Sequence, residues 1–413
     1  GCKEVKLCLA IGGAIDRARA GGFQHGEMAH QDLIARGFHR FKPDAAAHFG
    51  QNVGQVRNKA GRVRIVGQDA DSVERLDAFA ESYPTARRGG GAAEQDAGDW
   101  WRLVRVALER FAAHPRAGEV AGIGVTSQVN THLFCGPGLE PLAPAVTWQD
   151  TRAAAAGAGL EARMGAEEKV AALGAPIPFD ASHALSRMVW MAGAAPGVWA
   201  ATEHVLLPKD WVIARLTGEV AADPLSAIGL AGADLAYAAP VLDLVERAAG
   251  VLAPLRDPVE VVGRVSDGLP FAGCPVVGGT MDAWASMLGL GVAGEGEAMY
   301  LSGTSEVMGL ISEVRTGRGA VVTFPPWRGI VLHAAPTQSG GASLDWLARI
   351  TGRGPAELSE MASGGRIGPG SPLFLPHLEG ERAPLWDAVS RGGFAGLSAA
   401  HGVTELAASV MEG

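Results

Sequence analysis

The sequence predicts an α/β protein built from two units in series. Residues 62–66 alternate like a strand, and residues 121–125 read as a buried strand that precedes several helical stretches. After about Gly263 the pattern restarts with a strand at 274–278, then a helix and further strands. Two α/β units in series commonly leave a cleft in which ligands bind. The expected architecture is therefore two α/β domains with an interdomain cleft.

Composition excludes several classes of protein. The 413 residues are 47% hydrophobic and 19% charged, which is typical of a globular chain with a large core. The formal net charge of −9 argues against a nucleic-acid partner. No apolar run reaches the roughly 18–20 residues of a membrane helix, and residues 5–11 are too short for a signal peptide. The 4 cysteines lack metal or disulfide spacing, so we expect free thiols in a cytoplasmic protein.

The first unit is expected to place most of its helices after its opening strand. Residues 83–91 read as a loop, and Asp99 is the expected cap of the helix that follows. The apolar residues of that helix recur at three- and four-residue intervals, as in a helix packed on one face. Further helices are expected around residues 153–173, 184–193 and 208–217.

The second unit is expected to begin with the strand at 274–278 and a helix that starts at Asp282. Four consecutive strands are expected at residues 298–301, 307–311, 320–324 and 330–334. Helices are then expected at residues 342–350 and from about Val403. The expected division of the chain is an atypical segment at 1–61, a first domain at 62–265 and a second domain at 266–413.

Asp282 is the candidate catalytic carboxylate. It follows a buried strand and the turn Gly278-Gly279, and glycine lets a substrate or a phosphate approach the backbone closely. Gly303-Thr304-Ser305 is a glycine–hydroxyl turn whose N–H and O–H groups could hold phosphate oxygens. The alternative is that Asp282 only compensates a helix dipole and that the turn only closes a hairpin. A base beside a phosphate loop is the minimum equipment for phosphoryl transfer to an alcohol.

Candidate substrate-binding side chains follow two apolar stretches. Gln128 and Asn130, with Val129 between them, come just after the strand at 121–125, and Asp150 and Arg152 follow a second stretch. Strand ends are where α/β proteins place ligand-binding side chains, and these polar groups suit a polyol. Loop capping remains the alternative for each residue taken singly.

Other motifs do not support a dinucleotide, P-loop or metal site. Residues 289–294 match GxGxxG by letter but lie at an expected helix end, and no GxxxxGK[ST] loop exists. His25 and His30 are five residues apart and therefore do not share one helix face.

From about residue 62 onward, the chain resembles the FGGY carbohydrate kinases and looks most like their xylulokinase-type members. Six pieces in the family's order carry the resemblance. They are Tyr83-Pro-Thr with Glu94-Gln-Asp and Asp99-Trp-Trp; Trp148-Gln-Asp-Thr-Arg152; Leu207-Pro-Lys-Asp210 with Arg215-Leu-Thr-Gly218 and Asp223-Pro224; Gly279-Thr-Met-Asp282; Ser302-Gly-Thr-Ser305; and the run from Phe374 to Asp387 with Arg391-Gly392.

The resemblance implies an actin- and hexokinase-type fold of two ribonuclease H-like domains, the first binding sugar and the second nucleotide. It implies Asp282 as the base, residues 128–130 with Asp150 and Arg152 at the sugar, and Gly303-Thr304-Ser305 at the ATP phosphates. ATP and Mg²⁺ are the implied cofactors, and a small sugar or polyol is the implied partner. The oligomeric state stays open, with a homodimer as one alternative.

Three departures from the family pattern affect the expected activity. Residues 1–61 contain no Asp-x-Gly-Thr phosphate loop, and the family's later glycine-rich adenine motif is not found before Gly413. Val129-Asn130 stands where xylulokinases show Met-His, which leaves pentuloses, pentitols and tetritols open as substrates. We therefore expect weak or no turnover from this chain. A non-catalytic sugar-binding protein and a truncated, inactive gene product are the alternatives.

Overall fold

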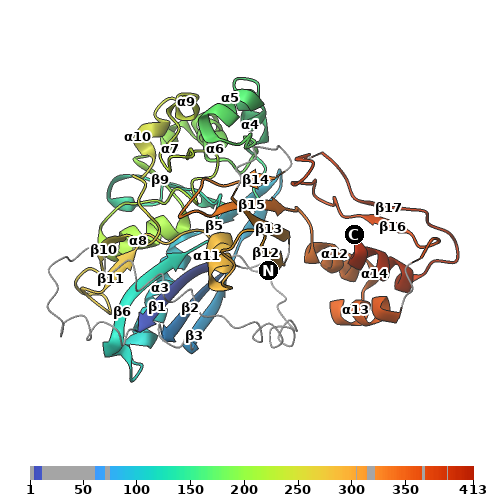
Figure 1. The fold of residues 1–413 in the computed structure, drawn as a ribbon, viewed down its shortest axis with the longest axis horizontal. Coiled ribbons are helices and arrows are strands. Elements are labelled where there is room, and N and C mark those ends of the chain that lie inside the picture. Colours follow the sequence, from blue (N-terminus) through green and yellow to red (C-terminus); the bar gives the residue numbers. More distant parts are fainter. Residues whose placement is uncertain are drawn as a thin grey trace.

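A six-stranded sheet organises the first half of the molecule (Figure 1). The computed structural model describes residues 4–11, 61–69, 75–303, 305–313, 321–364, 368–387 and 389–413. The sheet has the order β10-β11-β6-β1-β2-β3. Its strands are β1 (Glu4–Ile11), β2 (Gly61–Asp69), β3 (Arg75–Tyr83), β6 (Val120–Thr126), β10 (Val261–Arg264) and β11 (Pro275–Val277). The strands predicted near residues 62, 121 and 274 are confirmed, and all three belong to this one sheet.

Strand directions in this sheet are mixed. β1 runs parallel to β2 and antiparallel to β6, while β6 and β11 run parallel to each other. The pairing of β11 with β6 ties residues 275–277 to the first unit, although the predicted division at 265/266 assigns them to the second. We therefore propose a domain limit after the helix that follows β11.

Helices α3 (Ala97–Ala112) and α8 (Pro208–Thr217) share a buried core with strands of this sheet. The rings of Trp100 and Trp211 meet edge to face with centroids 6.2 Å apart. The cap of α3 is Asp96, whose carboxylate accepts the Gly98 N–H at 2.8 Å, so the expectation of Asp99 as the cap was wrong. Asp99 lies within the first turn and pairs with Arg102 instead, because the helix begins three residues earlier than the apolar spacing indicated.

A helical region and two small sheets make up the rest of the first half (Figure 1). The helices are α4 (Ala154–Glu161), α5 (Ala166–Leu173), α6 (Ala184–Ala194), α7 (Pro196–Ala201), α9 (Ala239–Leu242) and α10 (Ala248–Val251), with one-turn helices η2 (Ala117–Glu119) and η3 (Pro137–Leu139). The small sheets are β4 (Ala86–Arg88), β5 (Ala92–Gln95) and β8 (Ala145–Val146), and β7 (Leu133–Cys135) with β9 (His204–Leu206). The three predicted helical stretches are confirmed, and the predicted loop at 83–91 contains the short strand β4.

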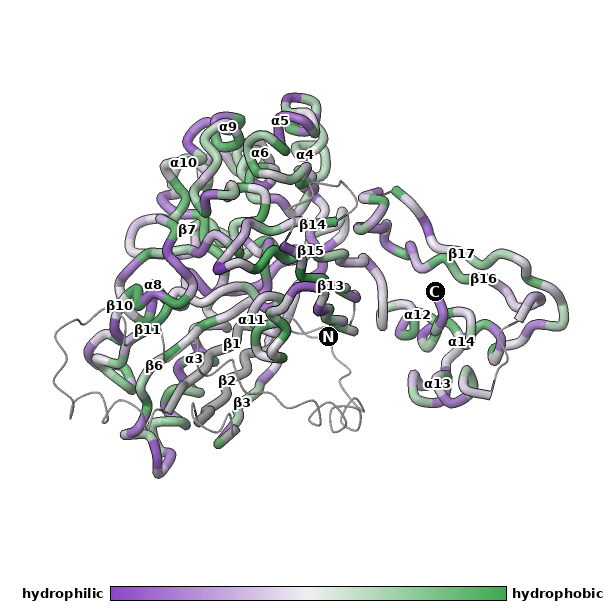
Figure 2. The backbone as a smooth tube through the Cα atoms, in the orientation of Figure 1, coloured by the Kyte–Doolittle hydropathy of each residue, from purple (hydrophilic) through white to green (hydrophobic). Residues whose placement is uncertain are grey.

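The second half contains a four-stranded antiparallel sheet of order β12-β13-β15-β14. Its strands are β12 (Ala298–Ser302), β13 (Glu306–Ser312), β14 (Val322–Thr323) and β15 (Val331–Pro336). Helix α11 (Asp282–Gly289) buries Trp284 against Phe324 and Trp327 with perpendicular rings. Hydrophobic stretches meet in this central region (Figure 2). The four predicted strands and the helix at Asp282 are confirmed.

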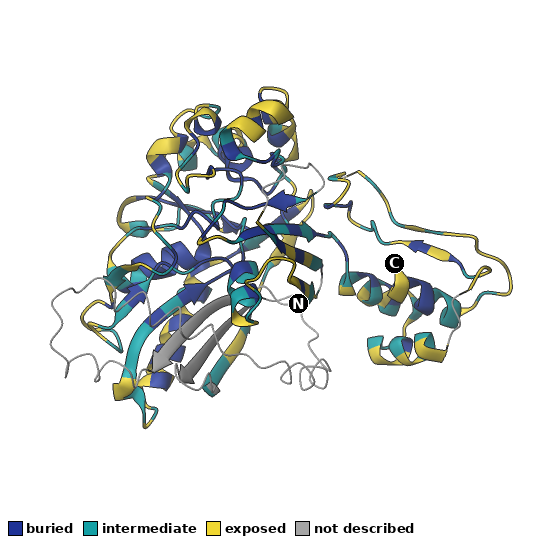
Figure 3. Cartoon of the chain, in the orientation of Figure 1, coloured by how far each residue is buried: buried dark blue, intermediate teal, exposed yellow. Residues whose placement is uncertain are grey.

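The last elements form a lobe at one side of the molecule (Figure 1). They are α12 (Gly341–Thr351), α13 (Pro355–Gly364), α14 (Val403–Glu412) and the pair β16 (Leu373–Leu375) and β17 (Gly393–Ala395). A small core around Leu347, Leu358 and Phe374 holds this lobe together, and α13 exposes much of its surface (Figure 3). Across the described residues, no helix has both the length and the apolar character to cross a membrane.

Candidate active site

Asp282 is the first residue of α11 and lies beside the end of β6. Its N–H donates to the carbonyl of Ser127 at 2.9 Å, and Ser127 forms a parallel bridge with Met281. Its own Oδ1 accepts the N–H of Ala283 at 2.9 Å. Because Ser127 directly precedes Gln128, this contact places the candidate base next to the candidate sugar-binding loop.

The turn before Asp282 requires glycine. Gly279 has φ of +61°, and a Cβ at this position would lie 1.9 Å from the carbonyl oxygen of Val125 in β6. Its N–H donates to the carbonyl of Pro258 at 2.7 Å. Only glycine combines the left-handed conformation with this close backbone approach. The glycine turn therefore seats the start of α11 directly against β6.

A buried ion cluster lies under this turn. Nζ of Lys209 is 2.6 Å from Oδ1 of Asp210 and 2.8 Å from Oδ2 of Asp223, and the three side chains are 0–2% exposed. Burial alone would lower the pKa of Lys209, but the two carboxylates outweigh it and raise that pKa. Burial raises the pKa of Asp210. The lysine therefore stays charged throughout the physiological range.

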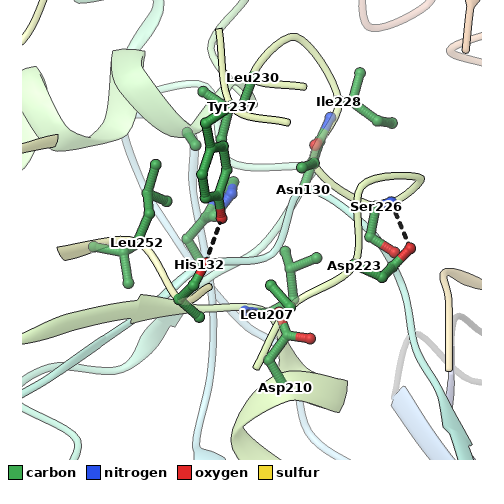
Figure 4. A pocket seen from close by; sticks show the side chains of 15 residues that line it. Asn130, His132, Leu207, Asp210, Asp223, Ser226, Ile228, Leu230, Tyr237 and Leu252 are labelled. Atoms are coloured by element: carbon green, nitrogen blue, oxygen red, sulfur yellow. Dashed lines mark hydrogen bonds between the residues drawn. The ribbon is translucent and has the colours of Figure 1, made fainter. Parts of the chain in front are cut away.

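A small cavity of about 30 Å³ opens between this cluster and the candidate sugar-binding loop (Figure 4). Its polar lining comes from Asn130, His132, Asp210, Asp223, Ser226 and Tyr237. Burial, with Arg187 and His183 nearby, holds the pKa of His132 well below its ordinary value, so this imidazole is neutral at pH 7. The cavity has room for about two water molecules and not for a sugar.

The predicted residues of the sugar-binding loop have specific partners. Gln128 is 1% exposed and donates to Oε1 of Gln95 at 2.7 Å. Val129 is partly buried against the largest core cluster. Asn130 has φ of +54° and donates from Nδ2 to the hydroxyl of Ser182 at 3.0 Å. Asn130 is thus held in a left-handed conformation that an asparagine tolerates better than most residues.

Asp150 and Arg152 form a second polar group. Nη2 of Arg152 lies 2.7 Å from Oδ2 of Asp150 and 2.7 Å from Oε1 of Glu94. Oδ2 of Asp150 also accepts the N–H of Ala93 at 2.9 Å. The guanidinium lies over the ring of Trp190, 4.5 Å from its centroid. Strand β5 connects the two groups, since Glu94 contacts Arg152 and the neighbouring Gln95 contacts Gln128.

The predicted phosphate turn joins β12 and β13. Gly303 and Ser305 lie in this turn, and Thr304 lies outside the described residues. The carbonyl of Gly303 accepts the N–H of Gly341 at 2.7 Å, and a Cβ on Gly341 would lie 2.7 Å from the same oxygen. The N-terminus of α12 is therefore packed against the turn. The positive end of a helix dipole beside a glycine turn favours a phosphate group.

A divalent ion fits this site only with help from a nucleotide. Within the described ranges, no cluster of three or more His, Cys, Asp or Glu side chains could hold a metal ion. Mg²⁺ is commonly bound through substrate phosphates with one or two carboxylates. Asp282 is a carboxylate at the site that could contribute in this way.

Sequence reasoning missed several residues that organise the site. Lys209 and Asp223 stood within family-like pieces but received no role, and Arg187 carried no signal at all. Side-chain burial is what distinguishes them, because Lys209, Asp223 and Arg187 are each 0% exposed. A charged residue in a sequence is read as exposed unless its partners are known.

Residues 65–289, more than half of the chain, match the model of the FGGY family of carbohydrate kinases, N-terminal domain. A xylulose kinase from Klebsiella pneumoniae is 30% identical over 332 residues, which cover 78% of this chain and 68% of that protein. The chain belongs to the FGGY family. This FGGY protein is therefore a carbohydrate kinase, which uses ATP and a divalent metal ion to phosphorylate a sugar.

Solved structures agree with this assignment. A xyloylose kinase from Brucella ovis has a TM-score of 0.71 to this FGGY kinase at 27% identity, covering 82% of this chain and 71% of that one. A ligand-bound xylulose kinase from Lactobacillus acidophilus has a TM-score of 0.74 at 23% identity, with the same coverage of both chains. At this identity the similarity supports the fold and not the substrate. The FGGY kinase thus has the two-domain actin- and hexokinase-like fold that its sequence implied.

Proposed function

We propose that this kinase transfers the γ-phosphoryl group of ATP to a hydroxyl of a pentulose, pentitol or tetritol, with Asp282 as general base. One observation carries the proposal. The N–H of Asp282 donates to the carbonyl of Ser127, and Ser127 directly precedes the candidate sugar loop at residues 128–130. The carboxylate therefore lies next to the loop that presents Asn130.

The proposed reaction needs one proton transfer and one displacement. The substrate hydroxyl gives its proton to Asp282 as its oxygen bonds to the γ-phosphorus of ATP. The bond between that phosphorus and the β,γ-bridging oxygen breaks, and ADP leaves. Gly303, Thr304 and Ser305 hold the phosphates beside the N-terminus of α12 in this proposal. Mg²⁺, when bound, neutralises charge on the phosphate oxygens.

The substrate class rests on the sugar loop and on the relatives. The curated relatives include xylulose kinases, which favours a pentulose. Val129 and Asn130 offer one apolar contact and one amide where a xylulokinase pattern would offer Met-His, so the hydrogen bonds to the sugar differ. A small polyol without a keto group suits an amide equally well, because the amide both donates and accepts.

A coupled ATP-consumption assay over pentuloses, pentitols and tetritols tests the proposal. We expect one of these classes to stimulate ATP consumption, and Asp282→Ala to lower kcat by at least ~10²-fold, as expected for a general base. Asp267→Ala is the matched control, since this exposed carboxylate lies outside the site. Full turnover by Asp282→Ala would contradict the role of Asp282.

We also propose that turnover of this chain is slow. Residues 1–61 contain no Asp-x-Gly-Thr loop, and losing one phosphate donor typically costs ~10²–10³ in rate. Isothermal titration separates slow catalysis from a sugar-binding protein without catalysis. We expect both a polyol and ATP to bind, and binding of the polyol alone would favour the non-catalytic alternative.

A further inference from the structure

The loop that carries Asp282 is tied to the buried ion cluster at two points. Nζ of Lys209 donates to the carbonyl of Gly278 at 3.2 Å. The hydroxyl of Thr280 donates to Oδ1 of Asp223 at 3.0 Å. Thr280 is itself only 6% exposed, so water does not compete freely for this bond. The first and third residues of the loop 278–282 are therefore fixed by side chains from distant segments.

A third tie reaches Asp282 itself. The hydroxyl of Ser127 accepts the N–H of Lys209 at 3.1 Å, and the carbonyl of the same Ser127 accepts the N–H of Asp282 at 2.9 Å. Lys209 thus fixes the loop both through its side chain and, by way of Ser127, through its main chain. These ties connect the start of α8, the end of β6 and the start of α11.

Stability alone does not account for this cluster. Two carboxylates and one ammonium are taken out of water, and a buried ion pair often stabilises a fold no better than apolar residues of similar size. Its hydrogen bonds are instead directional, and two of them join the cluster to the loop that carries Asp282. Oδ1 of Asp223 also accepts the N–H groups of Leu225 and Ser226, and these two bonds fix the position of Asp223.

We propose that Lys209, Asp223 and Thr280 are positioning residues that hold the carboxylate of Asp282 in the geometry needed to take the substrate proton. This inference rests on the proposed role of Asp282 as the base. A misplacement of about 1 Å at a reacting group can cost ~10²-fold in rate, so a loosened loop lowers kcat without altering the sugar or nucleotide contacts. Lys209 and Asp223 act through the loop in this proposal, because both side chains are 0% exposed.

Thr280→Val is the principal test, because valine keeps the shape of threonine and removes only the hydroxyl. We expect kcat to fall roughly tenfold while KM for the sugar stays within about twofold. Thr280→Ser, which restores the hydroxyl, should recover most of the activity. Thr202→Val is the matched control: Thr202 is 1% exposed and its hydroxyl donates to the carbonyl of Val198 at 2.7 Å, far from the loop in sequence.

Amide hydrogen exchange supplies a readout that does not depend on turnover. Thr280→Val should speed exchange at the N–H of Asp282, and Thr202→Val should not. Asp223→Asn keeps the size of the side chain and removes its charge, and it should also speed exchange at the N–H of Asp282. Wild-type kcat and wild-type exchange in Thr280→Val would overturn the inference.

The two proposals fail in different ways. If Asp282→Ala keeps full turnover, Asp282 is not the base, whatever the exchange data show. A second outcome is that Asp282→Ala is inactive while Thr280→Val and Asp223→Asn match the wild type in kcat and in amide exchange. That result would support Asp282 as the base and refute the positioning role of Lys209, Asp223 and Thr280.

Discussion

Arg187 shows how one buried side chain can organise several segments of the site. It is fully buried and donates to the main-chain carbonyls of Asn130, Val146 and Thr147, with Nη1 also 2.9 Å from Nδ1 of His132. Burial lowers the pKa of its guanidinium to about 10, which still leaves it charged at pH 7. The fork geometry of arginine lets one side chain reach both the carbonyl of Asn130 and the carbonyls of Val146 and Thr147.

Arg187→Lys keeps the charge but presents its donors from a single point. We expect the contact with the carbonyl of Asn130, or those with Val146 and Thr147, to be lost. KM for the sugar should then rise roughly tenfold, the equivalent of one charged hydrogen bond. Arg247→Lys is the control, because Arg247 also donates to two carbonyls, those of Trp199 and Thr202, away from the sugar loop. Equal KM values for the two variants would contradict this role.

Helix α6 is capped by a histidine instead of the usual hydroxyl or carboxylate. Nδ1 of His183 accepts the N–H of Leu185 at 3.2 Å, and Nε2 lies 3.2 Å from the carbonyl of Gly229. This pairing requires the neutral tautomer with its proton on Nε2. Burial lowers the pKa of His183 to about 4, so the cap is intact at neutral pH.

The lowered pKa of His183 determines how the free energy of unfolding depends on pH. The folded pKa lies below the unfolded value of about 6.5, so the unfolded chain takes up the proton first as the pH falls. The free energy of unfolding should therefore be unaffected by His183 above about pH 6.5 and fall by roughly 3 kcal/mol towards pH 4. Urea denaturation at pH 7, 6 and 5 measures this loss.

His183→Asn, which preserves a capping acceptor, should flatten the pH dependence. A remaining slope is expected from His132, whose pKa is also lowered by burial. An unchanged slope in His183→Asn would show that His183 does not titrate in this window.

At the scale of the whole molecule, the two halves are packed together. The largest core cluster includes Phe134 and Leu185 from the first half and Met299 and Leu332 from the second. The guanidinium of Arg382, in the segment between β16 and β17, lies 5.7 Å from the ring centroid of Trp148, which is close in sequence to the proposed sugar-binding residues Asp150 and Arg152. This contact joins the last lobe to the first unit.

Arg382→Ala should weaken sugar binding without abolishing the fold. A partly buried cation–π contact contributes roughly 0.5–2 kcal/mol, so KM for the sugar should rise about two- to thirtyfold. Arg215→Ala is the control, because Arg215 lies over Trp101, 5.2 Å from its ring centroid, within the first unit. A normal KM in Arg382→Ala, measured on folded protein, would show that the contact does not serve the sugar site.

Local sequence patterns predicted most strands and helices of this protein. The spacing behind Asp99 reflects the one-sided burial of α3, which a local pattern records directly. The same patterns misjudged the cap of α3 by three residues and gave no indication that the strand at 274–278 pairs with β6. Helix ends and strand partners depend on contacts with distant residues, which the local pattern does not contain.

The sequence by itself determined the family, through ordered motifs that include Gly279 to Asp282, and with it the kinase chemistry. Only the tertiary structure revealed what holds those motifs in place. Lys209, Asp223 and Arg187 are ordinary charged residues in the sequence. Their structural role becomes visible because they are completely buried among hydrogen-bond partners up to 82 residues away. Asp282 is visible as a carboxylate after a glycine turn, but its position beside Ser127 exists only once β6 and α11 are brought together.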